Sequence, residues 1–153
     1  YIINLQGDEP MIDVEDVKNL HNKAIDNKSE IATLACEIKN KIIYSKNDIV
    51  KVITEKKLTK DDTRKAKIFL REVSKNNIEN TYHHIGIYIF EVSILKKFVN
   101  LEQTENEISQ KLEQLRAMDN NISIDVNLAN TSPIGVDTKE DYLEIKKLME
   151  YKI

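Results

Sequence analysis

The chain has 153 residues, of which 41% are hydrophobic and 32% are charged, and its formal net charge is −3 at pH 7. This length and composition predict one folded domain over residues 1–153 and exclude a disordered tail. The basic residues are dispersed among acidic ones, which argues against nucleic-acid binding because a phosphate backbone needs a concentrated basic face. No apolar run approaches the roughly 20 residues of a membrane-spanning helix, so we expect no membrane partner.

The first half of the chain alternates predicted strands with a helix. Strands are expected at residues 1–5, 31–38, 48–53 and 66–73, because these stretches are apolar and rich in β-branched residues. Tyr1–Leu5 is typical of a central, buried strand. Asp13 can cap a helix whose apolar positions recur at helical spacing. Between the strands, residues 39–47 predict a loop or a short helical turn, and the charged residues 56–65 a hairpin tip or flexible loop.

The second half continues the alternation. Residues 84–90 and 122–129 predict strands, and residues 91–99, 105–118 and 137–151 predict helices. Strands alternating with helices favour an α/β fold with a mostly parallel mixed sheet. The single cysteine, Cys36, lies in an apolar stretch, so we expect a small buried side chain and a reducing, cytoplasmic compartment.

The chain begins at Tyr1, inside a predicted strand, without an initiator methionine or a signal peptide. We therefore expect it to be a fragment of a longer protein.

The few glycines and prolines gather in three short segments. The chain contains three glycines and two prolines, below the usual shares of roughly 7% and 5%. All five lie in Gln6–Pro10, His84–Tyr88 and Pro133–Thr138. Such scarcity indicates that each of these glycines and prolines is required by the local backbone conformation.

Asp8 and Asp137 are candidate metal ligands. Asp8 follows a predicted strand at the sheet edge where α/β proteins bind ligands, and a carboxylate there can hold Mg²⁺. From local sequence alone, a turn-and-cap role before the next helix is the simpler explanation. Asp137 likewise precedes a helix and can be its N-cap. A metal site would be favoured over these capping roles only if the fold brought the two carboxylates together.

Four segments together resemble the 3-deoxy-manno-octulosonate (KDO) cytidylyltransferases, which have the nucleotide-diphospho-sugar transferase (Rossmann-like) fold. The matching residues are Asn4–Ile12, His84–Tyr88, Leu112–Arg116 and Gly135–Thr138 with Glu140 and Asp141. The match runs nearly end to end, and the combination of the second and third segments favours KDO over sialic acid as the sugar.

The resemblance implies that CTP and KDO react to give CMP-KDO and pyrophosphate, for lipopolysaccharide synthesis. It implies that Asp8 and Asp137 are catalytic ligands of Mg²⁺, and that the protein is a cytoplasmic homodimer. It also implies a sugar pocket lined by Gln6, Arg71, His84, Tyr88, Glu113 and Gln114. Arg71 would meet the sugar carboxylate, because a guanidinium matches that group with two parallel hydrogen bonds.

Four of the pocket residues also have a purely structural explanation. His84 opens an apolar strand and could be a core histidine, whereas its neighbour His83 matches no motif and is expected at the surface. Glu113 and Gln114 could be solvated neighbours of buried leucines, and Arg71 could pair with a nearby carboxylate.

The sequence also departs from the family pattern. Nothing in it resembles the basic N-terminal loop that holds the CTP phosphates, so we expect residues 1–153 alone to lack cytidylyltransferase activity. Two alternatives stay open: a cytidylyltransferase for another acidic sugar such as a sialic acid, or a non-catalytic sugar-acid-binding or dimerising fragment.

Overall fold

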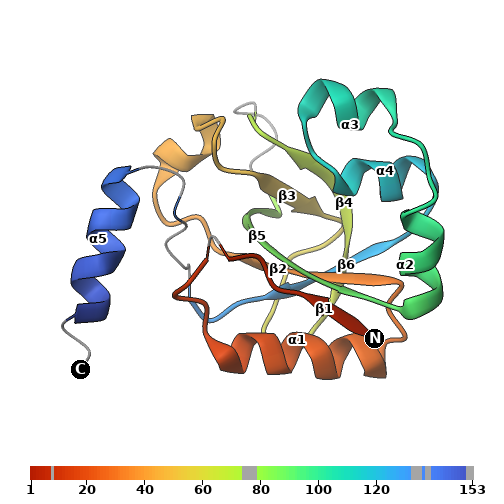
Figure 1. The fold of residues 1–153 in the computed structure, drawn as a ribbon, viewed down its shortest axis with the longest axis horizontal. Coiled ribbons are helices and arrows are strands. Elements are labelled where there is room, and N and C mark those ends of the chain that lie inside the picture. Colours follow the sequence, from red (N-terminus) through yellow and green to blue (C-terminus); the bar gives the residue numbers. More distant parts are fainter. Residues whose placement is uncertain (8, 74–78, 132–135, 137–138, 151–153) are drawn as a thin grey trace.

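In the computed structural model, residues 1–7, 9–73, 79–131, 136 and 139–150 are described. They form a mixed sheet with helices on both faces (Figure 1). The strands are β1 (Ile2–Asn4), β2 (Ile31–Cys36), β3 (Lys51–Thr54), β4 (Arg64–Leu70), β5 (Thr81–Phe90) and β6 (Ile124–Leu128). The helices are α1 (Val14–Asp26), α2 (Val92–Phe98), α3 (Glu105–Gln110), α4 (Gln114–Asp119) and α5 (Lys139–Glu150), with a 3-10 turn η1 (Lys41–Ser45). None of the described helices is long and apolar enough to cross a membrane.

Strand β5 organises the two faces of the sheet. Its residues Ile85, Ile87 and Ile89 are buried on the side that α1 covers, and Cys36 is buried there as expected. The alternate positions of β5 face α2 and α4, where a row of rings begins at Phe69 and ends at Phe98. The period of two along one strand therefore separates an aliphatic core from an aromatic one.

The α/β class and the mixed sheet are confirmed, but the expected parallel majority was wrong. The described strands are ordered β1-β5-β2-β6-β4-β3, and β2–β6 is the one parallel pairing among them. The pairings β1–β5, β2–β5, β3–β4, β3–β5 and β4–β6 are antiparallel. The reason is that β4 and β5 run opposite to the other strands and stand between them.

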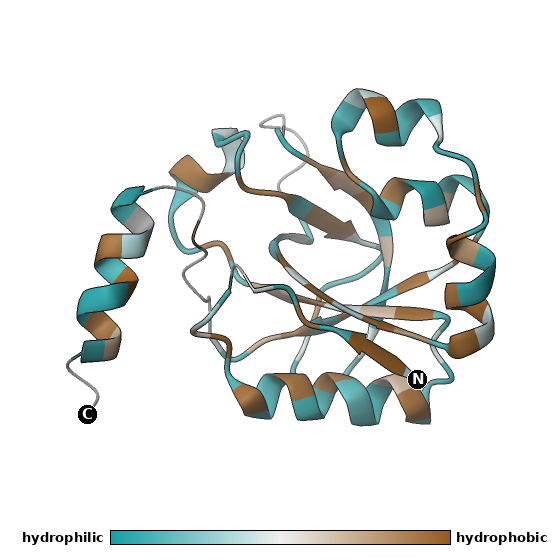
Figure 2. Ribbon diagram, in the orientation of Figure 1, coloured by the Kyte–Doolittle hydropathy of each residue, from teal (hydrophilic) through white to brown (hydrophobic). Residues whose placement is uncertain are grey.

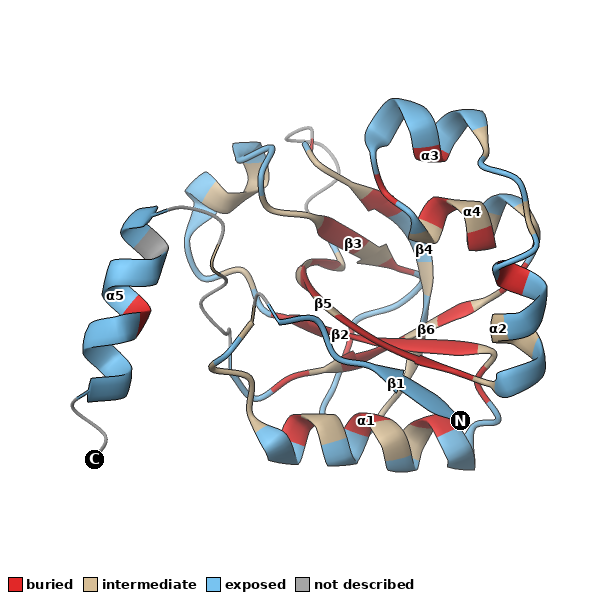
Figure 3. Cartoon of the chain, in the orientation of Figure 1, coloured by how far each residue is buried: buried red, intermediate tan, exposed pale blue. Residues whose placement is uncertain are grey.

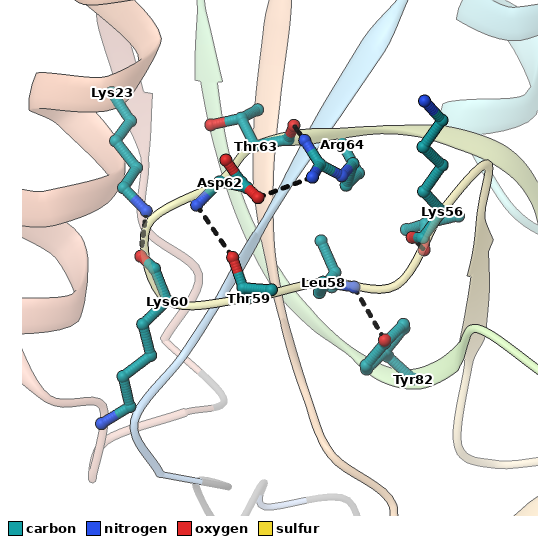
Figure 4. A network of polar contacts seen from close by, with 10 residues as sticks. Lys23, Lys56, Leu58, Thr59, Lys60, Asp62, Thr63, Arg64 and Tyr82 are labelled. Carbon is teal, nitrogen blue, oxygen red and sulfur yellow. Dashed lines mark hydrogen bonds and ion pairs between the residues drawn. The ribbon is translucent and has the colours of Figure 1, made fainter.

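The β3–β4 hairpin closes the sheet on itself. Because β3 also pairs with β5 and β4 pairs with β6, the pairings run in a closed circuit through β5, β2, β6, β4 and β3. The predicted hairpin tip is confirmed, and hydrogen bonds hold it (Figure 4). The Leu58 N–H donates to the hydroxyl of Tyr82 at 2.8 Å, and Lys23 of α1 donates to the carbonyl of Lys60.

Strand β1 lies at the edge of the sheet, whereas the sequence predicted a central, buried strand. Ile2 and Ile3 are 44% and 41% exposed. The strand is apolar in Figure 2 and exposed in Figure 3. Its apolar composition suggested burial, but β1 pairs with β5 along one edge only.

The single helix predicted over residues 105–118 is instead two short helices, α3 and α4. Lys111 ends α3 in the left-handed conformation, with φ of 53°. Leu112 and Leu115 are buried on either side of the start of α4, so the apolar spacing continues across the break. Periodicity alone could not reveal this change of direction.

Candidate functional site

A cavity of about 470 Å³ lies where β5 changes its neighbour along one edge. Strand β2 occupies the other edge, so β1 and β3 must share this one. β1 pairs with Tyr88–Phe90 and β3 with Thr81–His83. Residues 84–87 lie between the two pairings. The cavity opens at this gap, and its wall is made of side chains from several elements.

The segment after β1 approaches β5 inside the gap. The N–H of Gly86 donates to Glu9 Oε1 at 3.2 Å, and a Cβ at Gly86 would lie 3.2 Å from Gln6 Oε1. A larger residue here would press on the end of the Gln6 side chain, which would have to shift by a few tenths of an ångström. Two of the three glycine-containing segments of the sequence thus meet at this point of the fold.

Five of the predicted pocket residues line this cavity: Gln6, His84, Tyr88, Glu113 and Gln114. They come from the segment after β1, from β5 and from the start of α4. Their roles as sugar ligands stay predictions. Asp8 and Asp137 lie outside the described residues, so the predicted metal site cannot be placed.

Arg71 does not line the cavity but is hydrogen-bonded to segments whose residues do. Its guanidinium donates to the carbonyls of Asn47, Gln110 and Lys111 at 3.0, 2.9 and 3.0 Å. The carbonyls belong to the loop before β3 and to the turn between α3 and α4. The arrangement joins two parts of the wall, and a role of Arg71 in holding a carboxylate stays a prediction.

Lys51 supports the same loop from inside the protein. Its side chain is fully buried, and its ammonium donates to the carbonyls of Lys46, Ile49 and Arg71. An ammonium has three donors, so three carbonyls satisfy it. Burial lowers the pKa of Lys51, while Asp48 and Glu72 act in the opposite direction. The cation fixes the loop whose residues Lys46, Asp48 and Ile49 line the cavity.

His83 also lines the cavity, so the expectation of a surface residue was wrong. It is half-buried, and burial lowers its pKa, with a smaller contribution from the nearby charge of Lys51. The sequence did not predict this because the motif assigned His84 to the pocket. Neighbouring side chains on a strand point to opposite faces, so His83 was expected to point away from the pocket. Other polar lining residues are Asn4 and Glu9, which belong to the first matching segment, and Lys46, Asp48 and Lys111, which had no sequence signal.

His84 and Tyr88 are both uncharged at neutral pH. Burial lowers the pKa of His84 to about 3, and the neighbouring His83 contributes in the same direction. Burial also raises the pKa of Tyr88, with a contribution from Glu113. The deep part of the cavity therefore offers neutral hydrogen-bonding groups, while the charged side chains Lys46, Asp48, Lys111 and Glu113 come from surrounding segments.

A buried ion pair supports the α3–α4 wall. Arg116 Nε donates to Glu107 Oε2 at 2.7 Å, and a second guanidinium nitrogen meets the other carboxylate oxygen. The guanidinium also lies 4.9 Å from the ring centroid of Phe98. These contacts tie α4 to α3 and α2, and α4 begins with Gln114 of the cavity wall.

Comparison with known proteins finds cytidylyltransferases. A family profile described as cytidylyltransferase matches residues 1–124. The 3-deoxy-manno-octulosonate cytidylyltransferase of Bartonella tribocorum is 36% identical over 148 residues, which are 97% of this chain and 60% of that protein. The protein of that name from Thermodesulfovibrio yellowstonii is 39% identical over 146 residues, covering 92% of this chain and 56% of the relative. The chain thus spans about 60% of the length of such relatives.

Solved structures agree on the fold. A CMP:2-keto-3-deoxy-manno-octonic acid synthetase complexed with CTP matches with a TM-score of 0.84 and 30% identity, over 99% of this chain and 62% of that one. A UTP-bound UGPase from Acinetobacter baumannii has a TM-score of 0.62 at 10% identity, over 89% of this chain and 44% of its own. The second likeness shows the fold alone.

Gly86→Ala should loosen the segment after β1, because the new methyl group would crowd Gln6 and disturb the bond to Glu9. Loss of one such hydrogen bond, about 1 kcal/mol, corresponds to roughly fivefold faster hydrogen exchange at the amide of residue 86. Gly7→Ala is the matched control, since a Cβ there meets nothing within 4 Å. Equal effects of both substitutions would contradict the crowding argument.

Arg116→Met should lower the free energy of unfolding by about 3–5 kcal/mol, because Glu107 would be left as an unpaired buried charge. The double variant Glu107→Gln/Arg116→Met should lose less of the free energy of unfolding, as urea unfolding at neutral pH can measure.

The same ion pair makes stability depend on pH. Hydrogen bonding to Arg116 lowers the pKa of Glu107 to about 2, below its unfolded value of roughly 4.3. The stabilisation is therefore complete above the unfolded pKa and is lost as pH falls through the folded one. Equal losses in the single and double variants would argue against the ion pair.

Proposed function

We propose, from the premise that this chain belongs to the cytidylyltransferase family, that it forms the sugar-binding part of a KDO cytidylyltransferase. Such an enzyme joins CTP and KDO to give CMP-KDO and pyrophosphate. The observation that carries the proposal is that five residues assigned to the sugar by resemblance line one cavity, although they are up to 108 positions apart (Gln6 to Gln114). The relatives named above support KDO, rather than a sialic acid, as the sugar.

The chemistry of the cavity suits a sugar acid. His84, Tyr88 and Gln114 can exchange hydrogen bonds with hydroxyl groups, and Glu113 can accept them. Lys46 and Lys111 carry ammonium groups that would attract a carboxylate. The apolar side chains of Ile31 and Phe90 exclude water from one side. These residues would bind and orient the sugar, which is the main contribution that a protein makes to such a transfer.

CTP is proposed as the second substrate because the similar solved synthetase was studied with CTP. The curated relatives are longer than this chain, which covers 60% of the Bartonella tribocorum protein. We propose that the parts of such a protein that this chain does not match hold the nucleotide. The complete reaction then belongs to the full-length protein.

We further propose that Asp8 and Asp137 hold Mg²⁺. Support comes from the donor chemistry, since Mg²⁺ prefers a few carboxylates together with substrate phosphates. In the sequence, Asp8 directly precedes Glu9, which lines the cavity. When bound, the ion would offset negative charge that develops on phosphate oxygens.

A homodimer and a cytoplasmic location complete the proposal. The first rests on the resemblance and the second on the use of one cysteine without a disulfide partner in the chain.

The wild-type chain should bind KDO without CTP or Mg²⁺, and more tightly than it binds N-acetylneuraminic acid, as isothermal calorimetry can measure. Tyr88→Phe should weaken KDO binding roughly three- to tenfold, the effect of one lost hydrogen bond. Tyr142→Phe is the control, because Tyr142 lies exposed on α5. Absence of saturable KDO binding, or equal effects of both substitutions, would count against the sugar site.

The metal assignment can be examined with Mn²⁺, which shares the oxygen ligands of Mg²⁺. Mn²⁺ should broaden the amide resonances of Gly7, Glu9 and Val136 in the wild-type chain. The broadening should disappear in Asp8→Asn and Asp137→Asn, while Asp26→Asn at the end of α1 should leave it unchanged. If both aspartates can be replaced without effect on the broadening, the proposed ligands are wrong.

A further inference from the structure

The buried hydroxyl of Thr33 contacts three polar atoms of β5. Its Oγ1 lies 2.7 Å from the carbonyl oxygen of Ile87, 3.2 Å from that of Ile85 and 3.0 Å from Nε2 of His84. Thr33 is fully buried, so no bulk water competes for these contacts. The hydroxyl therefore connects the backbone of β5 to one ring nitrogen of a cavity residue.

An irregularity in the strand pairing creates this arrangement. Thr33 is paired with Tyr88, but the next residue, Leu34, is paired with Ile85. Two residues of β5, Gly86 and Ile87, are therefore left over between consecutive pairs. A bulge of this kind leaves backbone groups outside the regular ladder and re-aims side chains. The threonine hydroxyl lies against two carbonyls of this segment and can donate its single proton to one of them.

Counting protons fixes the direction of each hydrogen bond. The hydroxyl has one proton, and an O···O separation of 2.7 Å to the Ile87 carbonyl requires that proton to lie between the two oxygens. Thr33 Oγ1 can then take part in the contact with His84 only as an acceptor. Nε2 of His84 must be the donor. A neutral imidazole with its proton on Nε2 carries a lone pair on Nδ1.

The imidazole is held as a neutral ring beside two aromatic side chains. Its ring packs edge-on against Phe69 at 5.1 Å and lies 5.4 Å from the ring of Tyr88. Within the described residues, the His84 side chain makes no hydrogen bond besides the one to Thr33. His84 lines the cavity, so a ligand there can reach the remaining ring nitrogen.

We propose that Thr33 is a positioning residue that sets His84 as a hydrogen-bond acceptor, so that this point of the cavity selects a hydroxyl group of the bound sugar acid. The assignment rests on the proposed sugar site. A hydroxyl donates its proton to the Nδ1 lone pair, whereas a carboxylate oxygen would place a second lone pair against it. The sugar carboxylate must therefore lie elsewhere in the cavity, towards Lys46 or Lys111.

Nitrogen-15 NMR of the histidine-labelled wild-type chain tests the tautomer directly. At neutral pH, His84 should show a protonated Nε2 and an unprotonated Nδ1. His21 on α1 serves as an internal reference. Thr33→Ser should keep this pattern because it keeps the hydroxyl, and Thr33→Val should give a mixture of tautomers. A wild-type His84 with its proton on Nδ1 would overturn the proposal even if no variant folds.

Calorimetry with KDO and its single-deoxy analogues tests the selected hydroxyl. Thr33→Val should weaken KDO binding about tenfold, which is about 1.4 kcal/mol, and Thr33→Ser should stay within about twofold. One deoxy analogue should bind the wild-type chain more weakly than KDO does. This difference in affinity should be smaller in Thr33→Val, because the variant has already lost the same interaction. Equal losses for every analogue in both proteins would refute the acceptor role.

Failure of the sugar site and failure of the threonine role give different experimental results. If the wild-type chain binds no KDO, the proposed function and the hydroxyl selection both fall, whatever the tautomer. If KDO binds but His84 carries its proton on Nδ1, the sugar site stands and the role of Thr33 falls.

Discussion

Strand β5 has two edges and three neighbouring strands, and the cavity is the consequence. β2 takes one edge, so β1 and β3 divide the other between Tyr88–Phe90 and Thr81–His83. A strand edge left open between two partners exposes backbone groups that need hydrogen bonds. Here the Glu9 carboxylate and the Val50 carbonyl meet the N–H groups of Gly86 and His84. These N–H groups are therefore hydrogen-bonded without a partner strand, and space remains for a ligand.

Part of the cavity wall is built from loops, and two cationic side chains hold these loops in shape. Lys51 and the Arg71 guanidinium each donate to three main-chain carbonyls, and together they connect the loop before β3, the end of β4 and the α3–α4 turn. Loops usually move more than the elements they join. A binding wall made of them needs such cross-links, because a ligand bound by a mobile wall would first have to order it.

The sequence predicted the elements well where one physical signal dominated. The Asp13 cap, the apolar strands and the hairpin tip at residues 56–65 all appear in the structure. The break between α3 and α4 could not be predicted from the sequence. Lys111 takes the left-handed position at which a glycine would have marked the end of a helix. The exposure of β1 and the placement of Arg71 depend on partners distant in sequence. His83 was missed because the loop before β3, which is distant in sequence, contributes the part of the cavity wall beside it.

The protonation states of the cavity bear on the kind of chemistry it supports. An acid–base catalyst works best when its pKa lies near the pH of the reaction. His84, with a pKa lowered to about 3, and Tyr88, with a raised pKa, keep fixed proton positions around neutral pH. Such groups orient a substrate and do not exchange protons with it. A nucleotidyl transfer depends mostly on positioning and on charge stabilisation at the phosphate, so the neutral, oriented side chains of His84 and Tyr88 are consistent with the proposed binding role.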